Sequence, residues 1–349
     1  MIKRNNQSPY IWPAEWETQS ATWIAWPHNQ LTWRDRFEPI PNVYEQFVAE
    51  LARVQTVHVL SGPKELRYPA IRNLSNVTNV QIHDVVTNDT WVRDYGPTFV
   101  RRLDDGALVG VDWQFNAWGG KYPPFDDDAR AARAAQAICK IIGCPRSDSA
   151  MYCEGGALET DGAGTLLTTS SVLMNPTRNP GWTREMVEGE LQRQLGVTNI
   201  IWVDGGGLLG DDTDGHIDQL ARFVAPGVVV AAESSRLSDP NHAGLAENIR
   251  ILRRAKLTDR QQIVVYALPT PAPRFVDQKR VPESYCNFLF ANGVVIVPTF
   301  QSDATDRAAI RLFEQLLPDR KIIPLDATHL IWGLGAFHCA SQQQPVGKL

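Results

Sequence analysis

The chain has 349 residues, of which 43% are hydrophobic and 21% are charged. This length and composition allow a substantial buried core, in one large domain or in two. The formal net charge of −5 argues against a nucleic-acid-binding protein and leaves room for a cationic partner.

Membrane insertion and export are not expected either. No apolar run approaches the roughly 18 residues of a membrane-spanning helix, and the opening MIKRNNQSPY lacks the apolar core of a signal peptide. We therefore expect a cytoplasmic protein that does not bind a membrane. The five cysteines are scattered and form no C-x-x-C pair, so neither a disulfide framework nor a structural zinc site is expected.

Similar elements recur along the chain. Residues 41–54 predict a helix, and four later segments each predict a β-hairpin followed by an amphipathic helix. The hairpins have D-G, D-G, P-G and N-G turns, which favour reversal of the chain. The predicted hairpins span residues 93–113, 153–170, 215–233 and 284–300, and the helices that follow span residues 127–143, 183–196, 242–256 and 305–318.

The spacing of these repeats indicates how the units are arranged. Asp94, Glu154, His216 and Asn287 stand near the starts of the hairpins and are 60, 62 and 71 residues apart. This spacing suits an α/β fold of radially arranged units, with the first residues of every hairpin near one axis. Because no linker-like segment interrupts the series, residues 1–349 are predicted to form one domain. A two-domain, Rossmann-like enzyme is the alternative.

Two hairpin starts carry carboxylates of chemical interest. In NDTWVRDYGP, residues 88–97, the carboxylate of Asp94 near the aromatic ring of Trp91 suits a planar cation. A loop of solvated charges is the plainer interpretation. Glu154, which precedes two glycines, would lie near the predicted axis and could orient a cation or relay a proton. A glutamate at a β-bulge would need no such function.

The segment GDDTDGHID, residues 210–218, adds further candidates. It does not match a calcium-binding loop, because Gly210 stands at the first ligand position. His216 and Asp218 would share one face of a strand, and we expect a strand here because the hairpin return PGVVVAA follows. A hydrogen-bonded structural histidine is the alternative interpretation of His216.

Cys339, in GLGAFHCASQQQP, is the candidate nucleophile. A lone cysteine is more often a small buried residue. However, the two preceding glycines allow the backbone to approach a ligand closely, and the polar run at 341–344 is unusual for a core strand. Adjacent side chains on an extended chain point to opposite faces, so His338 is expected to be structural and His216 to be the partner of the cysteine.

Taken in order, these motifs resemble the agmatine deiminase family, which is related to bacterial peptidylarginine deiminases within the guanidino-group-modifying (pentein) superfamily. The resemblance rests on PAEWE, NDTWVRDYGP, FNAWGGKYPP, EGGALETDGAGTLLTT, LMNPTRNP, GDDTDGHID, SYCNFLFANGVVIVPTF and HCASQQQP. It implies a five-bladed α/β propeller of ββαβ units that requires no metal or cofactor. Leu334 and Ala336 interrupt the fuller glycine run that is usual in the family.

The resemblance also implies roles for the candidate residues. Cys339 would be the nucleophile and His216 the general acid and base. Two carboxylates would bind the guanidinium N–H groups, a third would assist, and an aromatic ring would form a wall of the site. In that order, these residues would be Asp94, Asp218, Glu154 and Trp91.

The predicted reaction is hydrolysis of agmatine to N-carbamoylputrescine and ammonia through a covalent thiouronium intermediate on the cysteine. Asp212 is the candidate to bind the distal amine of this small cationic substrate. One alternative is a deiminase of free or peptidyl arginine. Another is a metal-dependent hydrolase that uses His216, Asp218 and His338, and a third is a guanidinium- or polyamine-binding protein without activity. The resemblance is also compatible with a homodimer.

Overall fold

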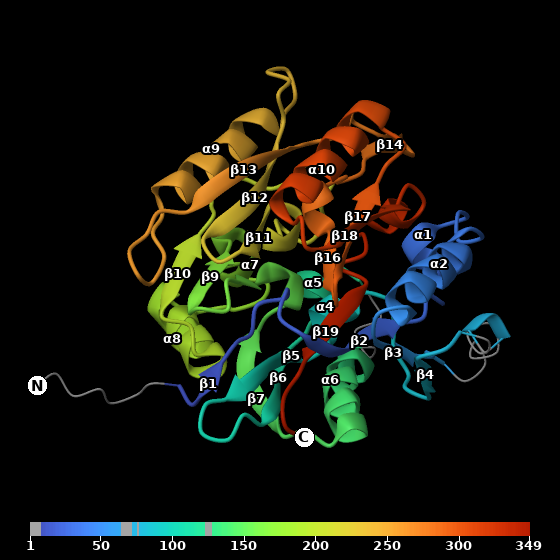
Figure 1. Ribbon diagram of the computed structural model, residues 1–349, viewed down its shortest axis with the longest axis vertical. Helices are drawn as coiled ribbons and strands as arrows, with labels where there is room; N and C mark the ends of the chain where they lie inside the picture. The colour runs from blue at the N-terminus through green and yellow to red at the C-terminus, as the bar shows by residue number, and fades with distance from the viewer. Residues whose placement is uncertain (1–7, 64–71, 75–76, 123–127) are drawn as a thin grey trace, which may run out of the picture.

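The computed structural model of the protein describes residues 8–63, 72–74, 77–122 and 128–349. Its main sheets repeat one plan, in which two antiparallel strands are followed by a helix and by a third strand parallel to the second (Figure 1). Four such units follow one another along the chain. Their elements are β5 (Thr98–Arg102), β6 (Leu108–Gln114), α6 (Asp128–Ile142) and β7 (Arg146–Tyr152); β8 (Glu159–Thr160), β9 (Thr165–Thr168), α8 (Arg184–Leu195) and β10 (Asn199–Trp202); β11 (Ala221–Ala225), β12 (Val228–Glu233), α9 (His242–Arg254) and β13 (Val264–Pro269); and β16 (Leu289–Ala291), β17 (Val294–Thr299), α10 (Asp303–Leu316) and β18 (Lys321–Asp326).

The two ends of the chain together build a fifth unit of the same plan. The last strand pairs antiparallel with a strand near the N-terminus, so that Ser341 lies opposite Ile24. The N-terminal strand then continues through a helix to a parallel partner. The elements are β19 (Ser341–Pro345), β2 (Gln19–Ala25), α2 (Ile40–Ala52) and β3 (Thr56–Leu60), and β4 (Val80–His83) extends the sheet.

The segments that precede the first strands of the units contact one another. Four of them are short helical turns, and each contacts the next: α4 (Val92–Tyr95), η3 (Gly155–Ala157), η4 (Ile217–Gln219) and η5 (Tyr285–Asn287). The turn before β19 completes the series, because the main-chain N–H of His338 donates to Asn287 and that of Arg93 donates to Cys339, at 3.4 and 3.3 Å. The starts of all five units therefore lie together.

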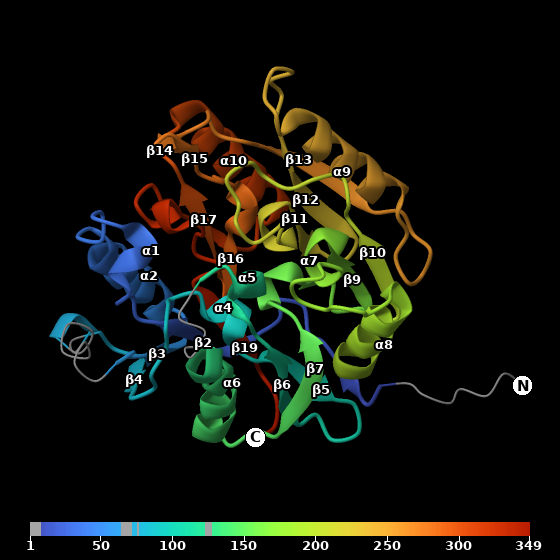
Figure 2. The same ribbon diagram turned by 180° about the vertical axis from the view of Figure 1, so that it is seen from behind.

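The helices that follow the hairpins lie at the rim of the molecule in both views (Figures 1 and 2). In α2, the buried side chains of Tyr44, Phe47, Val48 and Leu51 follow the three- and four-residue spacing of one helix face, which packs against β3. The five predicted helices are confirmed, with ends shifted by a few residues. No helix within the described ranges is long and apolar enough to cross a membrane.

The strand expected over residues 216–218 is a wrong prediction. His216 precedes η4, and β11 begins only at Ala221, where pairing with Ala231 starts. The main-chain N–H of Leu220 bonds to Ile217 at 2.9 Å and closes a helical turn instead. The residues before the hairpin therefore turn toward the neighbouring units.

The polar run at residues 341–344 is a fully buried strand, contrary to expectation. Specific partners make this burial possible. Gln344 Oε1 accepts a hydrogen bond from the indole of Trp23 at 2.9 Å, and Gln343 Oε1 accepts one from Arg93 at 2.5 Å. The polarity of the run did not predict its burial, because these amides bond to groups that are distant in the sequence.

Arg222 connects several units from within the protein. This fully buried side chain in β11 donates to Glu159 in β8 at 2.6 Å and to Glu15, near the N-terminus, at 2.8 Å. A third bond, at 2.9 Å, goes to the carbonyl of Phe288, just before β16. Buried carboxylates are tolerated when cations compensate them, so Arg222 both neutralises and cross-links this region.

We predict that Arg222→Met lowers the free energy of unfolding by about 3–5 kcal/mol, because the buried carboxylate of Glu15 loses its closest guanidinium partner. Urea unfolding followed by circular dichroism measures the change. Arg250→Met, which removes an exposed ion pair with Glu247, is the control and should leave the urea midpoint unchanged. An Arg222→Met variant that unfolds at the wild-type midpoint would contradict the prediction.

Candidate active site

A cavity of about 880 Å³ opens where the starts of the units meet. Acidic, basic and aromatic side chains and one thiol line it. The acids and aromatic rings suit a planar cation. The basic side chains are Arg34, Arg36, Lys121, Lys279 and Arg280. The lining residues that bear on function are Trp91, Trp118, Asp89, Asp94, Asp212 and Cys339. His216, Glu154 and Asp218 do not line the cavity and are themselves buried.

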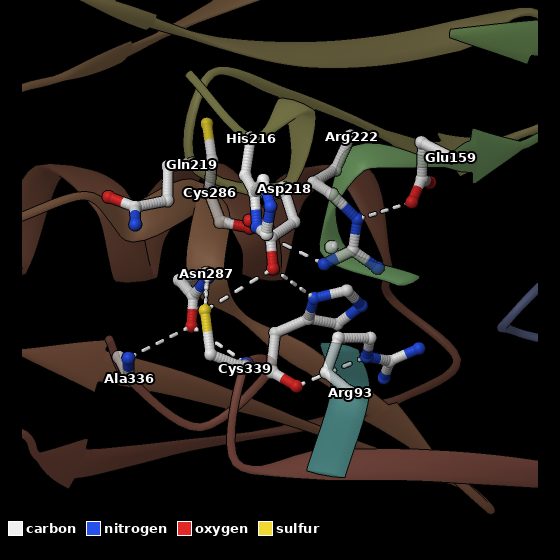
Figure 3. Close-up of polar contacts among 12 residues, drawn as sticks. Arg93, Glu159, His216, Asp218, Gln219, Arg222, Cys286, Asn287, Ala336 and Cys339 are labelled. Carbon is white, nitrogen blue, oxygen red and sulfur yellow. Dashed lines mark hydrogen bonds and ion pairs between the residues drawn. The ribbon is translucent and has the colours of Figure 1, made fainter. Parts of the chain in front are cut away.

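Cys339 lies in the turn before β19 and is 4% exposed. Its Sγ is 3.0 Å from Nδ2 of Asn287 and 3.4 Å from Oδ2 of Asp218 (Figure 3). Asn287 Oδ1 also accepts a bond from the main-chain N–H of Cys339 at 3.2 Å, which fixes the turn. Burial and the carboxylates of Asp218 and Asp94 raise the thiol pKa well above its ordinary value. Cys339 is therefore a protonated thiol at neutral pH in the free protein.

His216 is fully buried between two carboxylates. Its Nδ1 is 3.6 Å from Asp94 Oδ1 and its Nε2 is 3.7 Å from Glu154 Oε2, both beyond hydrogen-bond distance. Neither ring nitrogen has a hydrogen-bond partner in the described part of the chain. Burial lowers the pKa of His216, but Asp94, Glu154 and Asp218 outweigh burial and raise it to about 9. His216 is thus an imidazolium at neutral pH.

Glu154 is kept ionised by a buried arginine. Nε of Arg178 lies 2.7 and 3.0 Å from the two carboxylate oxygens of Glu154. Burial raises the pKa of Glu154, but His216 and Arg178 outweigh this effect and lower it. Arg178 is itself held by Asp214 at 2.7 Å. A fixed negative charge therefore stands beside the imidazolium.

Asp94 is oriented by two donors. The indole N–H of Trp118 donates to Oδ2 at 2.9 Å, and the main-chain N–H of Gly156 donates to Oδ1 at 3.0 Å. Burial raises the pKa of Asp94 to about 6, although His216 opposes the increase. A Cβ atom on Gly156 would come within 2.5 Å of His216 Nδ1 and 2.8 Å of Asp94 Oδ1. Only glycine fits at this position.

A strained turn carries Trp118. Ala117 and Trp118 have φ angles of 52° and 57°, a left-handed conformation that non-glycine residues seldom adopt. Two glycines with φ of 81° and 78° continue it. Strain of this kind often marks a functional site. Trp118 and Tyr122 both line the cavity.

Asp218 presents one carboxylate oxygen that is unused. Oδ2 accepts a bond from Nδ1 of His338 at 2.8 Å, whereas Oδ1 is buried and has no hydrogen-bond partner among the residues that the structure describes. Burial raises the pKa of Asp218, but the bond and charge of His338, together with the charges of His216 and Arg222, outweigh burial and lower the pKa. The second nitrogen of His338 bonds to Glu15 at 2.8 Å. His338 is thus fully engaged and is not the base for the neighbouring cysteine.

Trp91 packs against the glycine-containing loop that leads to Cys339. A Cβ atom on Gly333 or Gly335 would come within 2.9 or 2.6 Å of the indole ring, so both positions need glycine. Leu334, which interrupts the glycine run, has a φ of 69° and lines the cavity. The loop keeps a left-handed turn at this position, with leucine in a conformation that favours glycine.

Asp212 lies in the cavity but is already hydrogen-bonded. The hydroxyl of Tyr122 donates to its carboxylate, and burial raises its pKa. Asp89 also lines the cavity and accepts a bond from Thr32 at 2.7 Å. Burial raises the pKa of Asp89 to about 6, and the charge of Asp212 adds to this increase. Two acids, rather than one, therefore line the cavity beyond Asp94.

Several residues of the site had no role assigned from the sequence. Asn287 stands at the start of its hairpin, as Asp94 and His216 do, so its place in the repeat could have revealed it. Arg178 and Glu15 lie in motifs that supported the family resemblance, but no local pattern predicts their partners. Glu15 bonds to His338, which is 323 residues away.

The geometry gives little support to a metal-dependent hydrolase. Within residues 8–63, 72–74, 77–122 and 128–349, no group of three or more His, Cys, Asp or Glu side chains is arranged to hold a metal ion. His338, one ligand in that hypothesis, would have to break a bond to Asp218 or to Glu15 in order to bind a metal.

A mixed α/β fold that gathers a cysteine, a histidine and several buried carboxylates is typical of enzymes that act on guanidino groups. The model of the Porphyromonas-type peptidyl-arginine deiminase family matches residues 11–345. The chain belongs to this family.

Agmatine deiminases are among the relatives of the chain. Those of Stutzerimonas stutzeri (strain A1501) and Pseudomonas syringae pv. tomato are both 35% identical to it, over 97% and 96% of this chain and 96% and 95% of their own lengths. The Enterococcus faecalis agmatine deiminase structure is 30% identical, with a TM-score of 0.89 over 97% of this chain and 96% of its own. The C. jejuni enzyme, solved as a cysteine-to-serine variant with substrate bound, is 27% identical, with a TM-score of 0.89 over 97% of each chain. The resemblance drawn from the motifs is confirmed.

We predict that a guanidinium ion lowers the pKa of Cys339, because its charge offsets the carboxylates of Asp94 and Asp218 that disfavour the thiolate. Thiolate absorbance near 240 nm, measured against pH with and without millimolar guanidinium, tests this, with Cys339→Ala subtracted to remove the other cysteines. The titration should move to lower pH when the ion is added. Identical titration curves would contradict the prediction.

Proposed function

We propose that this protein is an agmatine deiminase, which hydrolyses agmatine to N-carbamoylputrescine and ammonia. The observation that carries the proposal is the pair of buried carboxylates, Asp94 and Asp218, close to both His216 and Cys339. A guanidinium group offers such a pair a delocalised positive charge and paired N–H donors. The agmatine deiminases that match nearly the whole chain support the choice of substrate.

In the proposed first half of the reaction, Asp94 and Asp218 hold the guanidinium plane in place. The bound cation favours ionisation of Cys339, whose proton passes to solvent, and the thiolate attacks the guanidinium carbon to give a tetrahedral adduct. His216, as the imidazolium, gives its proton to the departing nitrogen. The C–N bond breaks, ammonia leaves, and a positively charged thiouronium group remains on the sulfur. Trp91 forms a wall beside the planar group.

In the second half, neutral His216 removes a proton from water, and the resulting hydroxide attacks the thiouronium carbon. The carbon–sulfur bond then breaks and returns the thiolate, leaving the ureido product. The second proton that this step releases passes to solvent, where the ammonia that left in the first half becomes ammonium. Glu154, fixed by Arg178, keeps the charge of His216 balanced in both halves.

The acids further out in the cavity support agmatine as the substrate. Asp212 and Asp89 would bind the distal amine, although Asp212 would share its carboxylate with Tyr122. Free arginine would bring a carboxylate toward these acids, which repel it, whereas the nearby amine of Lys121 is already bound to the main-chain carbonyl of Asp212 and to the carboxylate of Asp214. A deiminase of peptidyl arginine is the second candidate, because the cavity of about 880 Å³ is larger than agmatine requires.

The fold completes the proposal. We infer that the five ββαβ units form a five-bladed propeller within one catalytic domain that spans the chain. The contacts between successive unit starts, and the placement of the helices at the rim, support this arrangement. The sheet shared by both chain ends, through β19 and β2, would close the ring.

Substrate preference and the nucleophile can be tested by measuring ammonia release from agmatine, arginine and a blocked arginine peptide. Agmatine should be the preferred substrate by at least about 100-fold over arginine, because the arginine carboxylate faces acids. Cys339→Ala should reduce kcat with agmatine by at least about a thousandfold, whereas Cys286→Ala, which alters a buried packing residue, should stay near the wild-type rate. Tight agmatine binding without ammonia release would instead indicate a binding protein, and unchanged activity in Cys339→Ala would exclude the cysteine mechanism.

The pH dependence of kcat/KM should be bell-shaped. Asp94 has to be ionised to bind the cation, so activity should fall below a pH of about 6, where it becomes protonated. His216 has to carry a proton for the leaving group, so activity should also fall above a pH of about 9, where it loses that proton. Initial rates from pH 5 to 10.5 at low agmatine concentration measure both limbs. A profile that stays flat above pH 9 would argue against His216 as the acid.

A further inference from the structure

His338 is bound at both ring nitrogens by carboxylates from different parts of the chain. Nδ1 is 2.8 Å from Asp218 and Nε2 is 2.8 Å from Glu15. The ring is 1% exposed, so water does not compete for these contacts. Ionised carboxylate oxygens only accept hydrogen bonds, and both contacts are therefore satisfied when each nitrogen carries a proton. A ring held at both ends in this way cannot turn without losing a buried bond.

Glu15, the partner of His338 at Nε2, is held in place by several groups. Glu15 accepts a bond from Arg222 at 2.8 Å and another from the main-chain N–H of Phe290 at 2.8 Å. Arg93 lies 3.7 Å from the same carboxylate. Because several groups hold Glu15, it can fix the position of the histidine ring.

Asp218, the partner of His338 at Nδ1, lies beside Cys339, the candidate nucleophile. The ring of His338 contacts Oδ2 of Asp218, and the thiol of Cys339 lies 3.4 Å from the same oxygen. Only Oδ1 remains without a hydrogen-bond partner within the described chain. The direction in which Oδ1 points therefore depends on how the ring holds Oδ2.

We propose that His338 is a positioning residue for deimination: anchored by Glu15, it fixes the carboxylate plane of Asp218 so that Oδ1 meets the guanidinium group. The proposal rests on the proposed function, and it assigns His338 no contact with substrate. His338 acts through Asp218 alone.

The arrangement also controls the charge of Asp218. The groups that face His338 are the carboxylates of Asp218 and Glu15, which raise its pKa, and the guanidinium groups of Arg93 and Arg222, which lower it together with burial. If the imidazole is removed, the buried carboxylate of Asp218 loses one of the groups that keep it ionised. It then takes up a proton at higher pH, and the acid limb of the activity profile, which Asp94 sets near pH 6, should move to higher pH when the pKa of Asp218 passes that value.

The test compares His338→Leu, His338→Gln and Glu15→Gln with a matched control, Glu159→Gln. Glu159 bonds to Arg222 in the same buried network, and neither of its bonds reaches His338 or Asp218. Burial raises the pKa of Glu159 to about 7, so its amide replaces a group that is already partly protonated. Glutamine at position 338 keeps one donor for Asp218, and it provides a milder variant if the leucine variant does not fold.

For His338→Leu, kcat/KM with agmatine should fall by about 10- to 100-fold, as for other residues that orient a ligand-binding group. The acid limb should also move to higher pH. His338→Gln and Glu15→Gln should show smaller losses in the same direction. Glu159→Gln should stay within about threefold of wild type, with its acid limb unchanged. Equal losses in Glu159→Gln and His338→Leu would overturn the positioning role.

A binding measurement separates this proposal from the proposed function. Isothermal titration of agmatine into Cys339→Ser protein should give a dissociation constant about 10-fold higher when His338→Leu is added, and little change when Glu159→Gln is added. If wild-type protein releases no ammonia from agmatine, the proposed function fails, and this titration alone decides the role of His338. Equal affinity with and without His338→Leu would refute it.

Discussion

Carboxylates buried where the five units meet are the constraint on which the rest of the structure depends. A buried carboxylate is strongly destabilising unless a cation and hydrogen bonds compensate it. Arg222, in the third unit, pairs with Glu159 of the second unit and with Glu15 near the N-terminus, whereas Arg178 pairs with Glu154 within the second unit. The Arg222 contacts, which neutralise two of these charges, therefore also hold units in register. A protein that merely needed stability could fill the same space with apolar side chains, so the cost of burying charge is more readily explained by a cationic ligand.

The balance of charge also links substrate binding to the state of the nucleophile. Buried carboxylates, among them Asp94 and Asp218, surround the thiol of Cys339 and raise its pKa. A guanidinium group would add one positive charge to this region, and ionisation of Cys339 would add one negative charge. Either change alone alters the net charge of a medium of low polarity, whereas both together do not. In the proposed mechanism, substrate binding is therefore a condition for forming the thiolate, which would protect the free enzyme from unproductive reactions of the cysteine.

Local patterns predicted the elements of the fold, because a helix face or a hairpin turn is encoded within about fifteen residues. The helix α2 and the hairpin of β11 and β12 could be identified in this way. The errors arose where distant partners decide the structure. The glutamines of β19 are buried because Trp23 and Arg93 bond to them, and His216 precedes a helical turn because its segment packs against neighbouring units. The family resemblance supplied candidate residues from every unit except that of Asn287, but it gave no indication that Glu15 reaches the site.

The repeated turns explain why His338 and Cys339, which are neighbours in the sequence, contact different residues. Each unit places one residue of the site just before its first strand, where a short turn, rather than a strand, sets the direction of the side chain. In chain order these residues are Asp94, Glu154, His216, Asn287 and Cys339. In the turn before β19, Cys339 is directed to Asn287 of the preceding unit, whereas His338 is directed to Asp218 and Glu15. A strand would also have separated these two side chains, but it would have placed them on opposite faces of a sheet. The turn instead keeps both near one carboxylate, so that the same oxygen of Asp218 contacts the thiol of Cys339 and the ring of His338.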